Sequence, residues 1–388
     1  MSRRLAGAIA LVAFTANACA LGGGEHASSR SKSARASASV AVTAAWSTAL
    51  DSPPTAVAAD GDGVVTTVDH RGVVSLDARG RVRWVAELDG ASVGAPVAFG
   101  DRVVVPTSRA DGSGGCAGLD RETGETRWTY EAIGTGGVAV ARAGDLVICV
   151  LRDGRTAGIP PSLGLAVWEY TFASDVDPST IEVPARTTIA VDEKAGYFAF
   201  TVRYGRQWAV AVHDIETGKT RRVLVLDGVP TSPAVVRTGV LAAAVSTTDA
   251  LVVVDVRAER WTQTPIPAAA GFDPATVPLV AGAVVVVAAR GGAVTAVDIS
   301  SRRPLWTAST PDPIADAHPL LVGSAVLLAT GTGQVAAFGL EHGDPVRLPR
   351  APGRVIATVD DPTSGAVSVV ARENTGGRIE SWEAQPES

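Results

Sequence analysis

The most regular feature of the chain is a series of short apolar runs, each bounded by glycine, proline and polar residues. They lie at 64–68, 103–105, 146–150, 197–200, 241–245, 284–287, 326–329 and 367–370. Successive runs begin roughly 43 residues apart, which is the period of a propeller blade built from four short strands. No long stretch has the periodicity of an amphipathic helix. The pattern therefore predicts an all-β chain that folds as an eight-bladed β-propeller of four-stranded antiparallel blades.

A second repeated pattern, D-x-x-T-G-x-x-x-W, marks one hairpin of each unit. Its complete form is Asp120, Thr123, Gly124 and Trp128. Aspartate and threonine side chains hydrogen-bond to the backbone of a turn, and glycine supplies a positive φ. Altered copies contribute the turn residues Asp214, Thr217, Gly218 and Asp298. A large flat ring at the same place in successive blades can pack between neighbouring sheets. The tryptophans that we expect to do so are Trp46, Trp84, Trp128, Trp168, Trp261 and Trp306.

The two ends of the repeat complement one another. The last unit ends at 377–383, where Trp382 takes the place that Val297 has in an earlier unit, so this unit lacks its outer strand. At the other end, residues from 42 to Trp46 have the pattern of a strand that belongs to no unit of its own. We therefore expect an N-terminal strand of about 42–48 to complete the last blade and close the ring, which removes two free sheet edges.

The hairpin pattern resembles the repeat of pyrroloquinoline-quinone (PQQ)-like propellers, the quinoprotein alcohol dehydrogenase-like fold, over about 42–388. This resemblance implies the fold. The quinoprotein dehydrogenases that share it bind PQQ with a calcium ion in the central funnel, and many place a disulfide of adjacent cysteines against the cofactor. This chain has no adjacent cysteines. We therefore expect neither a cofactor nor a metal, and a PQQ-dependent dehydrogenase with calcium is one alternative.

The N-terminal residues have the pattern of an export signal. Two arginines precede an uncharged apolar stretch over 5–16, which is too short to span a bilayer comfortably. A small-x-small cleavage signal over 16–18 precedes Cys19 and resembles that of bacterial lipoproteins, which implies acylation of Cys19. Ala16 stands where lipoproteins usually have a larger apolar residue, so ordinary secretion is the alternative. We predict a signal peptide over 1–18, a flexible tether rich in Gly, Ser, Ala and Arg over 19–40, and the propeller over 41–385.

Charge and the chemistry-bearing residues narrow the class of protein further. The formal net charge is −6 and no basic stripe occurs, which argues against nucleic-acid binding. The five histidines have no spacing typical of a metal site. Cys116 and Cys149 are the other two cysteines, either buried thiols or, in an exported chain, a structural disulfide. No motif stands in the structural context that a catalytic mechanism needs, so we expect no enzymatic activity.

The predicted anchor, tether and blades together resemble the propeller lipoprotein of the outer-membrane β-barrel assembly machinery. The resemblance implies a scaffold or assembly factor that binds envelope proteins and is held at the cell membrane by its lipid anchor. A ligand-binding or sensory propeller is the alternative within the binding class. The interval between units is longest over 171–188, so we take Asp175, Asp177 and Pro178 as a candidate partner loop. A tolerated insertion is the other interpretation of this segment.

Overall fold

A computed structural model describes the chain from residue 41 onward, with gaps. The described residues are 41–61, 63–68, 71–92, 94–171, 180–185, 187–245, 250–256, 260–265, 277–314, 319–322, 324–332, 334–346, 348, 354–360, 366–372 and 377–385. The predicted signal peptide, Cys19 and the tether lie outside them, and so do Asp175, Asp177 and Pro178. Within the described residues, no helix has the length and apolar character needed to cross a membrane.

Eight antiparallel sheets account for all the strands of the described residues, and they are numbered here in chain order. Sheet 1 comprises β2 (Pro54–Asp60), β3 (Gly63–Val68), β4 (Gly72–Leu76) and β5 (Val82–Glu87). Sheet 2 comprises β6 (Val97–Phe99), β7 (Arg102–Ser108), β8 (Gly114–Asp120) and β9 (Thr126–Ala132). Sheet 3 comprises β10 (Gly137–Ala143), β11 (Leu146–Leu151), β12 (Thr156–Ile159) and β13 (Trp168–Tyr170). Sheet 4 comprises β14 (Ile181–Glu182), β15 (Ala190–Asp192), β16 (Tyr197–Tyr204), β17 (Gln207–Asp214) and β18 (Thr220–Leu226).

The remaining sheets follow the same plan. Sheet 5 comprises β19 (Ala234–Arg237), β20 (Val240–Val245), β21 (Ala250–Asp255) and β22 (Arg260–Pro265). Sheet 6 comprises β23 (Leu279–Ala281), β24 (Val284–Ala288), β25 (Ala293–Asp298) and β26 (Arg303–Ser309). Sheet 7 has three strands, β27 (Leu320–Val322), β28 (Ala325–Ala329) and β29 (Val335–Gly339). Sheet 8 comprises β30 (Arg354–Asp360), β31 (Ala366–Arg372), β32 (Gly377–Gln385) and β1 (Ala41–Leu50).

The position of each strand within its sheet explains the apolar runs. Every residue of β3 and β20 is buried, because the second strand of a sheet is covered on both faces by the neighbouring sheets. The outer strands β5 and β18 instead alternate between more and less exposed residues. Strands that are buried on both faces are continuously apolar, whereas outer strands alternate. The eight runs in the sequence are therefore the second strands of the sheets.

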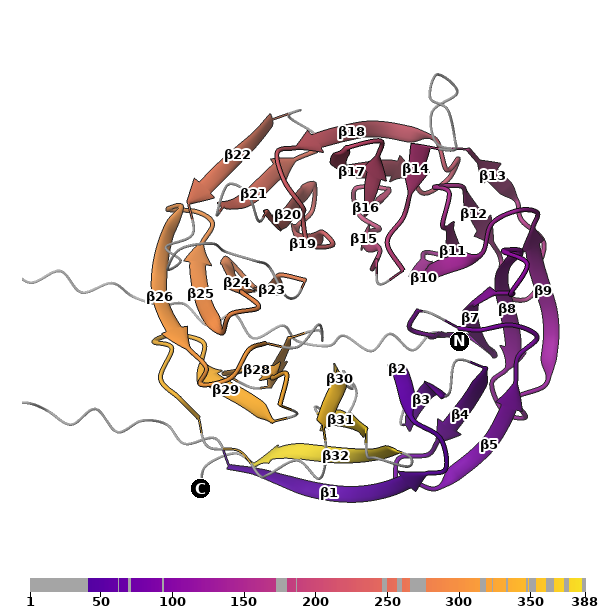
Figure 1. The fold of residues 1–388 in the computed structure, drawn as a ribbon, viewed down its shortest axis with the longest axis horizontal. Helices are drawn as coiled ribbons and strands as arrows, with labels where there is room; N and C mark the ends of the chain where they lie inside the picture. Colours follow the sequence, from indigo (N-terminus) through magenta and orange to yellow (C-terminus); the bar gives the residue numbers. More distant parts are fainter. Residues whose placement is uncertain are drawn as a thin grey trace, which may run out of the picture. The chain divides into compact units, whose positions relative to one another are not determined.

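The first strands of neighbouring sheets contact one another. β2 contacts β6, β6 contacts β10, and the series continues through β15, β19, β23, β27 and β30. β30 in turn contacts β2, so the first and last sheets of the chain are neighbours (Figure 1). The core lies between successive sheets; Val65 and Val73 of sheet 1, for example, pack against Val105 and Leu119 of sheet 2.

The N-terminal strand β1 lies beside the C-terminal strand β32, at the outer edge of sheet 8 (Figure 1). The pairing is antiparallel, and it places Trp46 opposite Ser381. The predicted strand 42–48 lies within β1. Trp46 packs against the core between sheets 8 and 1, together with Leu50 and Ile379.

The structure confirms the predicted all-β class and the four-stranded antiparallel sheets. It differs from the sequence-based expectation in two sheets. Sheet 4 has a fifth strand, because part of the long interval between repeats forms β14, which pairs with the end of β16 through Ile181 and Tyr204. Sheet 7 has no fourth strand within the described residues, where only Pro345 makes an isolated bridge to Phe338.

Candidate functional site

The sheets are joined by a repeated contact between a tryptophan of one sheet and a hairpin turn of the next. Trp84 of β5 lies flat on Gly124, so closely that a Cβ atom at this glycine would stand 2.6 Å from the ring. The indole Nε1 donates a hydrogen bond to the carbonyl oxygen of Arg121 at 2.8 Å. The same donor–acceptor pair recurs at three further junctions, from Trp128 to Pro161 at 2.7 Å, Trp168 to Ile215 at 3.1 Å and Trp306 to Leu340 at 2.7 Å.

Trp46 and Trp261 are the other two of the six tryptophans. Trp46 lies on Gly80 in the first turn of sheet 1, which links sheet 8 to sheet 1 in the manner of the other junctions. Trp261 stands opposite Val254, the residue directly before Asp255, whereas Trp128 stands opposite Gly118, two residues before Asp120. The shift arises because the β21–β22 pair lacks the bulge that the β8–β9 pair has. The side chain of Trp261 lies outside the described residues.

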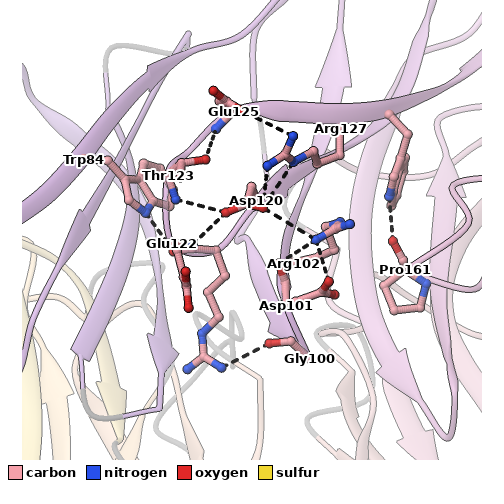
Figure 2. Close-up of polar contacts among 12 residues, drawn as sticks. Trp84, Gly100, Asp101, Arg102, Asp120, Glu122, Thr123, Glu125, Arg127 and Pro161 are labelled. Carbon is pink, nitrogen blue, oxygen red and sulfur yellow. Dashed lines mark hydrogen bonds and ion pairs between the residues drawn. The ribbon is translucent and has the colours of Figure 1, made fainter.

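The turn at Asp120 shows how the hairpin pattern works (Figure 2). The Asp120 carboxylate accepts hydrogen bonds from the backbone N–H groups of Glu122 and Thr123, both at 3.0 Å, and from the Arg127 guanidinium at 3.0 and 3.1 Å. The hydrogen bond from Arg127, with those from the turn backbone, lowers the pKa of Asp120 to about 2. Gly124 closes the turn with a φ of 76°. The polar residues of the pattern therefore fix the turn on which the tryptophan rests.

The turns in sheets 4 and 6 use the same aspartate with small differences. Asp214 accepts hydrogen bonds from the backbone N–H groups of Glu216 at 3.0 Å and Thr217 at 2.9 Å, and Gly218 closes that turn with a φ of 69°. Asp298 accepts one from the backbone of Ser301 at 2.6 Å, which lowers the pKa of the Asp298 carboxyl. Arg302 occupies the glycine position of this last turn with a φ of 58°. It is the only non-glycine residue among the described ones with a positive φ.

A buried carboxylate ties sheets 1 and 2 together beside the Asp120 turn. Asp60, at the end of β2, has no exposed surface. It accepts hydrogen bonds from Arg121 and, at 3.4 Å, from Arg83. Arg121 also donates to the carbonyl oxygen of Gly100 at 3.1 Å. One buried acid thus pairs with Arg83 of sheet 1 and with Arg121 of sheet 2.

Two open grooves flank sheet 2, one at each end of its strands. The groove beside the Asp120 turn measures about 730 Å³ and is lined by Arg83, Gly100, Asp101, Asp120, Arg121 and Glu122. The groove at the other end measures about 710 Å³, and its Arg109 pairs with Asp89 at 2.9 Å and Glu131 at 2.6 Å. Acidic and basic side chains lie together in both grooves.

The turn of sheet 3 keeps the geometry of this hairpin but loses its polar side chains. Gly164 has a φ of 69° and Trp128 rests on it, as Trp84 rests on Gly124. Where the sheet 2 turn has Thr123, Glu125 and Arg127, this turn has leucine, leucine and valine. Their exposed fractions are 64% for Leu163, 73% for Leu165 and 58% for Val167. We call these three side chains the sheet 3 apolar stripe.

The sequence did not single out this stripe. An apolar residue in a sequence predicts burial, and these three residues are exposed because they flank a short outer strand at the rim of the sheet. One signal was present: the segment from Pro160 to Trp168 aligns with Asp120 to Trp128 in spacing, yet it holds apolar residues at the positions of Thr123, Glu125 and Arg127. A comparison between repeats finds the stripe, whereas hydropathy alone does not.

Within the described residues, no three His, Cys, Asp or Glu side chains gather as a metal site requires. His213 is buried against the rings of Phe198 and Phe200, whose centroids each lie 5.1 Å from that of the imidazole. Burial lowers the pKa of His213 to about 4, so this side chain is neutral at physiological pH. Its surroundings are those of a core residue.

These sheets, junctions and turns define the class of protein, a β-propeller built from PQQ-like repeats. The chain belongs to the family described as outer membrane protein assembly factor BamB, whose model matches residues 29–235 and 205–379.

Solved structures with the same fold include natural and designed proteins. BamB from Moraxella catarrhalis is 18% identical, with a TM-score of 0.67 over 89% of this chain and 99% of that chain. The computationally designed Ika8 protein is 16% identical, with a TM-score of 0.70 over 88% and 99%. Quinohemoprotein alcohol dehydrogenase from Comamonas testosteroni is 14% identical, with a TM-score of 0.64 over 89% and 78%. At these identities the likeness establishes the fold alone, and no curated protein matches the chain.

Proposed function

We propose that this protein is a non-catalytic scaffold of the cell envelope, which binds partner proteins through the rim of its propeller. Membership of a family described as an outer membrane protein assembly factor supports an assembly role. The sequence supports export through the predicted signal peptide over 1–18, and membrane anchoring through acylation of Cys19.

We further propose that the propeller has eight blades and that β1 closes its ring. The eight sheets of the described residues and the contact of β30 with β2 support this closure. The pairing of β1 with β32 supports it independently, because it joins the two ends of the chain in one sheet. A closed ring is a rigid support, and surface segments held on a rigid support are where binding sites concentrate.

The observation that carries the binding proposal is the sheet 3 apolar stripe. Leu163, Leu165 and Val167 stand exposed where the sheet 2 turn has a hydroxyl, an acid and a base. Contiguous exposed apolar residues on a soluble domain mark interaction sites. The candidate loop with Asp175, Asp177 and Pro178 begins shortly after β13, so we propose that the stripe and this loop contact the same partner.

The experiment replaces the stripe by the residues that the neighbouring repeat has. The triple variant Leu163→Thr, Leu165→Glu, Val167→Arg reproduces the sheet 2 turn, and Val85→Arg serves as a matched control because Val85 is 67% exposed on β5. Partners are pulled down quantitatively from solubilised membranes with the tagged, anchored protein, and Cys19→Ser tests the anchor. We expect the wild type and Val85→Arg to retain one or two near-stoichiometric envelope proteins and the triple variant to lose them. Equal recovery by all three proteins contradicts a binding role for the stripe.

A PQQ-dependent dehydrogenase is the competing proposal from a different class, and its support is the fold shared with a quinohemoprotein alcohol dehydrogenase. Reconstitution with PQQ and calcium, followed by dye reduction with alcohols and sugars, separates the two. A scaffold reduces no dye above the protein-free control, whereas turnover would contradict the non-catalytic proposal.

A further inference from the structure

Two cysteines that are far apart in the sequence meet between sheets 2 and 3. Cys116 lies on β8 and Cys149 on β11, and neither has exposed surface. Both belong to one apolar cluster with Val104, Val147 and Ala157. Burial, together with the neighbouring Cys149 thiol, raises the pKa of Cys116 well above its ordinary value. The structure shows them as free thiols.

The two sheets approach one another unusually closely at this point. Packed sheets are normally about 10 Å apart, whereas the Cα atoms of a disulfide lie within roughly 7 Å. Next to Cys116, however, the backbones nearly touch, because a Cβ atom at Gly137 would stand only 1.8 Å from the carbonyl oxygen of Gly115. Cα atoms of β8 and β11 accordingly lie within 8 Å of one another. Gly115 of β8 and Gly137 of β10, the strand that pairs with β11, thus bring the backbones beside the two cysteines close together.

We infer that Cys116 and Cys149 form a disulfide bond in the mature protein and that this bond joins sheets 2 and 3. Each thiol loses a proton, one sulfur–sulfur bond forms, and two electrons pass to an oxidant. That oxidant is a disulfide-bonded thiol oxidoreductase of the exported compartment, which is itself reduced to a dithiol. The inference rests on the export that we propose for this chain, and it adds a covalent link to the scaffold.

Burial fixes when the bond forms. In the folded protein both thiols are inaccessible to an enzyme, and the raised pKa of Cys116 disfavours the reactive thiolate. The bond therefore forms during folding, before sheets 2 and 3 pack together. Once formed, it is protected from external reductants by the same burial.

The test is a thiol map of the wild-type protein isolated from envelope fractions. The protein is denatured and alkylated without reductant, then reduced, labelled with a second reagent and digested with trypsin. Each cysteine falls in its own peptide, residues 110–121 for Cys116 and 143–152 for Cys149. We expect both peptides to carry only the second label, and the unreduced digest to contain them joined, lighter by two hydrogens than their sum. First-label alkylation of both peptides, in protein shown by fractionation to be exported, overturns the inference.

Variants and a refolding control separate this inference from the proposed export. Cys149→Ala should leave Cys116 free, so that the 110–121 peptide takes the first label. If this variant does not fold, the thiol map of the wild-type protein alone tests the pairing. If the wild-type protein is found not to be exported, the proposed localisation fails. The chain is then refolded with oxidised glutathione: joined peptides support the pairing, and unjoined ones overturn it. Reductant present during heating reaches the bond once the protein unfolds, so it should also lower the melting temperature of the oxidised protein by several degrees.

Discussion

The contact between Trp84 and Gly124 offers the sharpest test of how the sheets are held together. Trp84 is only 7% exposed, and its ring fills the space above the glycine while Nε1 donates to Arg121. Replacing it by alanine removes a buried ring, which costs about 3–5 kcal/mol of unfolding free energy. Gly124→Ala has two separate effects, a side chain at a φ of 76° and a Cβ atom 2.6 Å from the ring.

These two effects can be separated by combining the substitutions. The positive φ costs about 1 kcal/mol, and it remains when the tryptophan is absent. The overlap with the ring costs about 1–3 kcal/mol, and Trp84→Ala abolishes it. The double variant should therefore be more stable than the sum of the single effects predicts, by about 1–3 kcal/mol. Gly134 is the matched control, because it has the same φ of 76° and nothing within 4 Å of a Cβ atom.

The assay is urea unfolding. Gly124→Ala and Gly134→Ala are each measured in the wild-type background and in the Trp84→Ala background, and the wild type and Trp84→Ala alone are the references. Gly134→Ala should cost about 1 kcal/mol in either background, since only the φ changes. If Gly124→Ala costs the same in both backgrounds, then the ring does not rest on this glycine, and the explanation of the D-x-x-T-G-x-x-x-W repeat as a packing device is refuted.

Three further predictions follow from single features of the structure. The pKa of His213 is about 4 in the folded chain and 6.5 ordinarily, so its contribution to the unfolding free energy is complete above pH 6.5 and falls by about 3 kcal/mol as the pH drops to 4. Unfolding curves of His213→Gln should lack this loss, and a variant with the same pH profile as the wild type would contradict the prediction. Arg302→Gly should raise the unfolding free energy by about 1 kcal/mol, because Arg302 has a φ of 58°, and an equal or lower value would argue against strain at this turn. Deleting residues 40–50 removes β1 and the contact of Trp46 with Gly80, which should lower the unfolding free energy by roughly 3–5 kcal/mol and lower the melting temperature. A truncated protein with the same melting temperature as the intact one would show that β1 does not complete the ring.

Much of the fold could be predicted because its physics is local and repeated. The second strand of each sheet is covered on both faces, so the run over 64–68 is continuously apolar and recurs with the period of the sheets. The turn at Asp120 depends on its own side chains and on Gly124, so its pattern survives in the sequence. The orphan strand that contains Trp46 could likewise be found from the missing strand of the last unit.

The features that could not be predicted from the sequence depend on contacts between residues that are distant along the chain. Trp261 follows Asp255 by two residues fewer than Trp128 follows Asp120, so the sequence marks this copy as shortened, but it does not show that a missing bulge shifts the pairing of Trp261 to Val254. The closeness of Cys116 and Cys149 follows from glycines on two different strands, which no spacing along the chain encodes. The exposure of Leu165 likewise depends on its place at a sheet edge.

Site-specific photo-crosslinking in the full-length, exported protein tests whether the rim of sheet 3 binds an envelope protein. A photoreactive residue is introduced at position 165, in the stripe, where the native leucine is 73% exposed, and separately at position 85 on β5, where the native valine is 67% exposed. Position 165 alone should crosslink to one defined envelope protein, the same one that the stripe variant fails to pull down. No crosslink at position 165, or identical products from both positions, would contradict it.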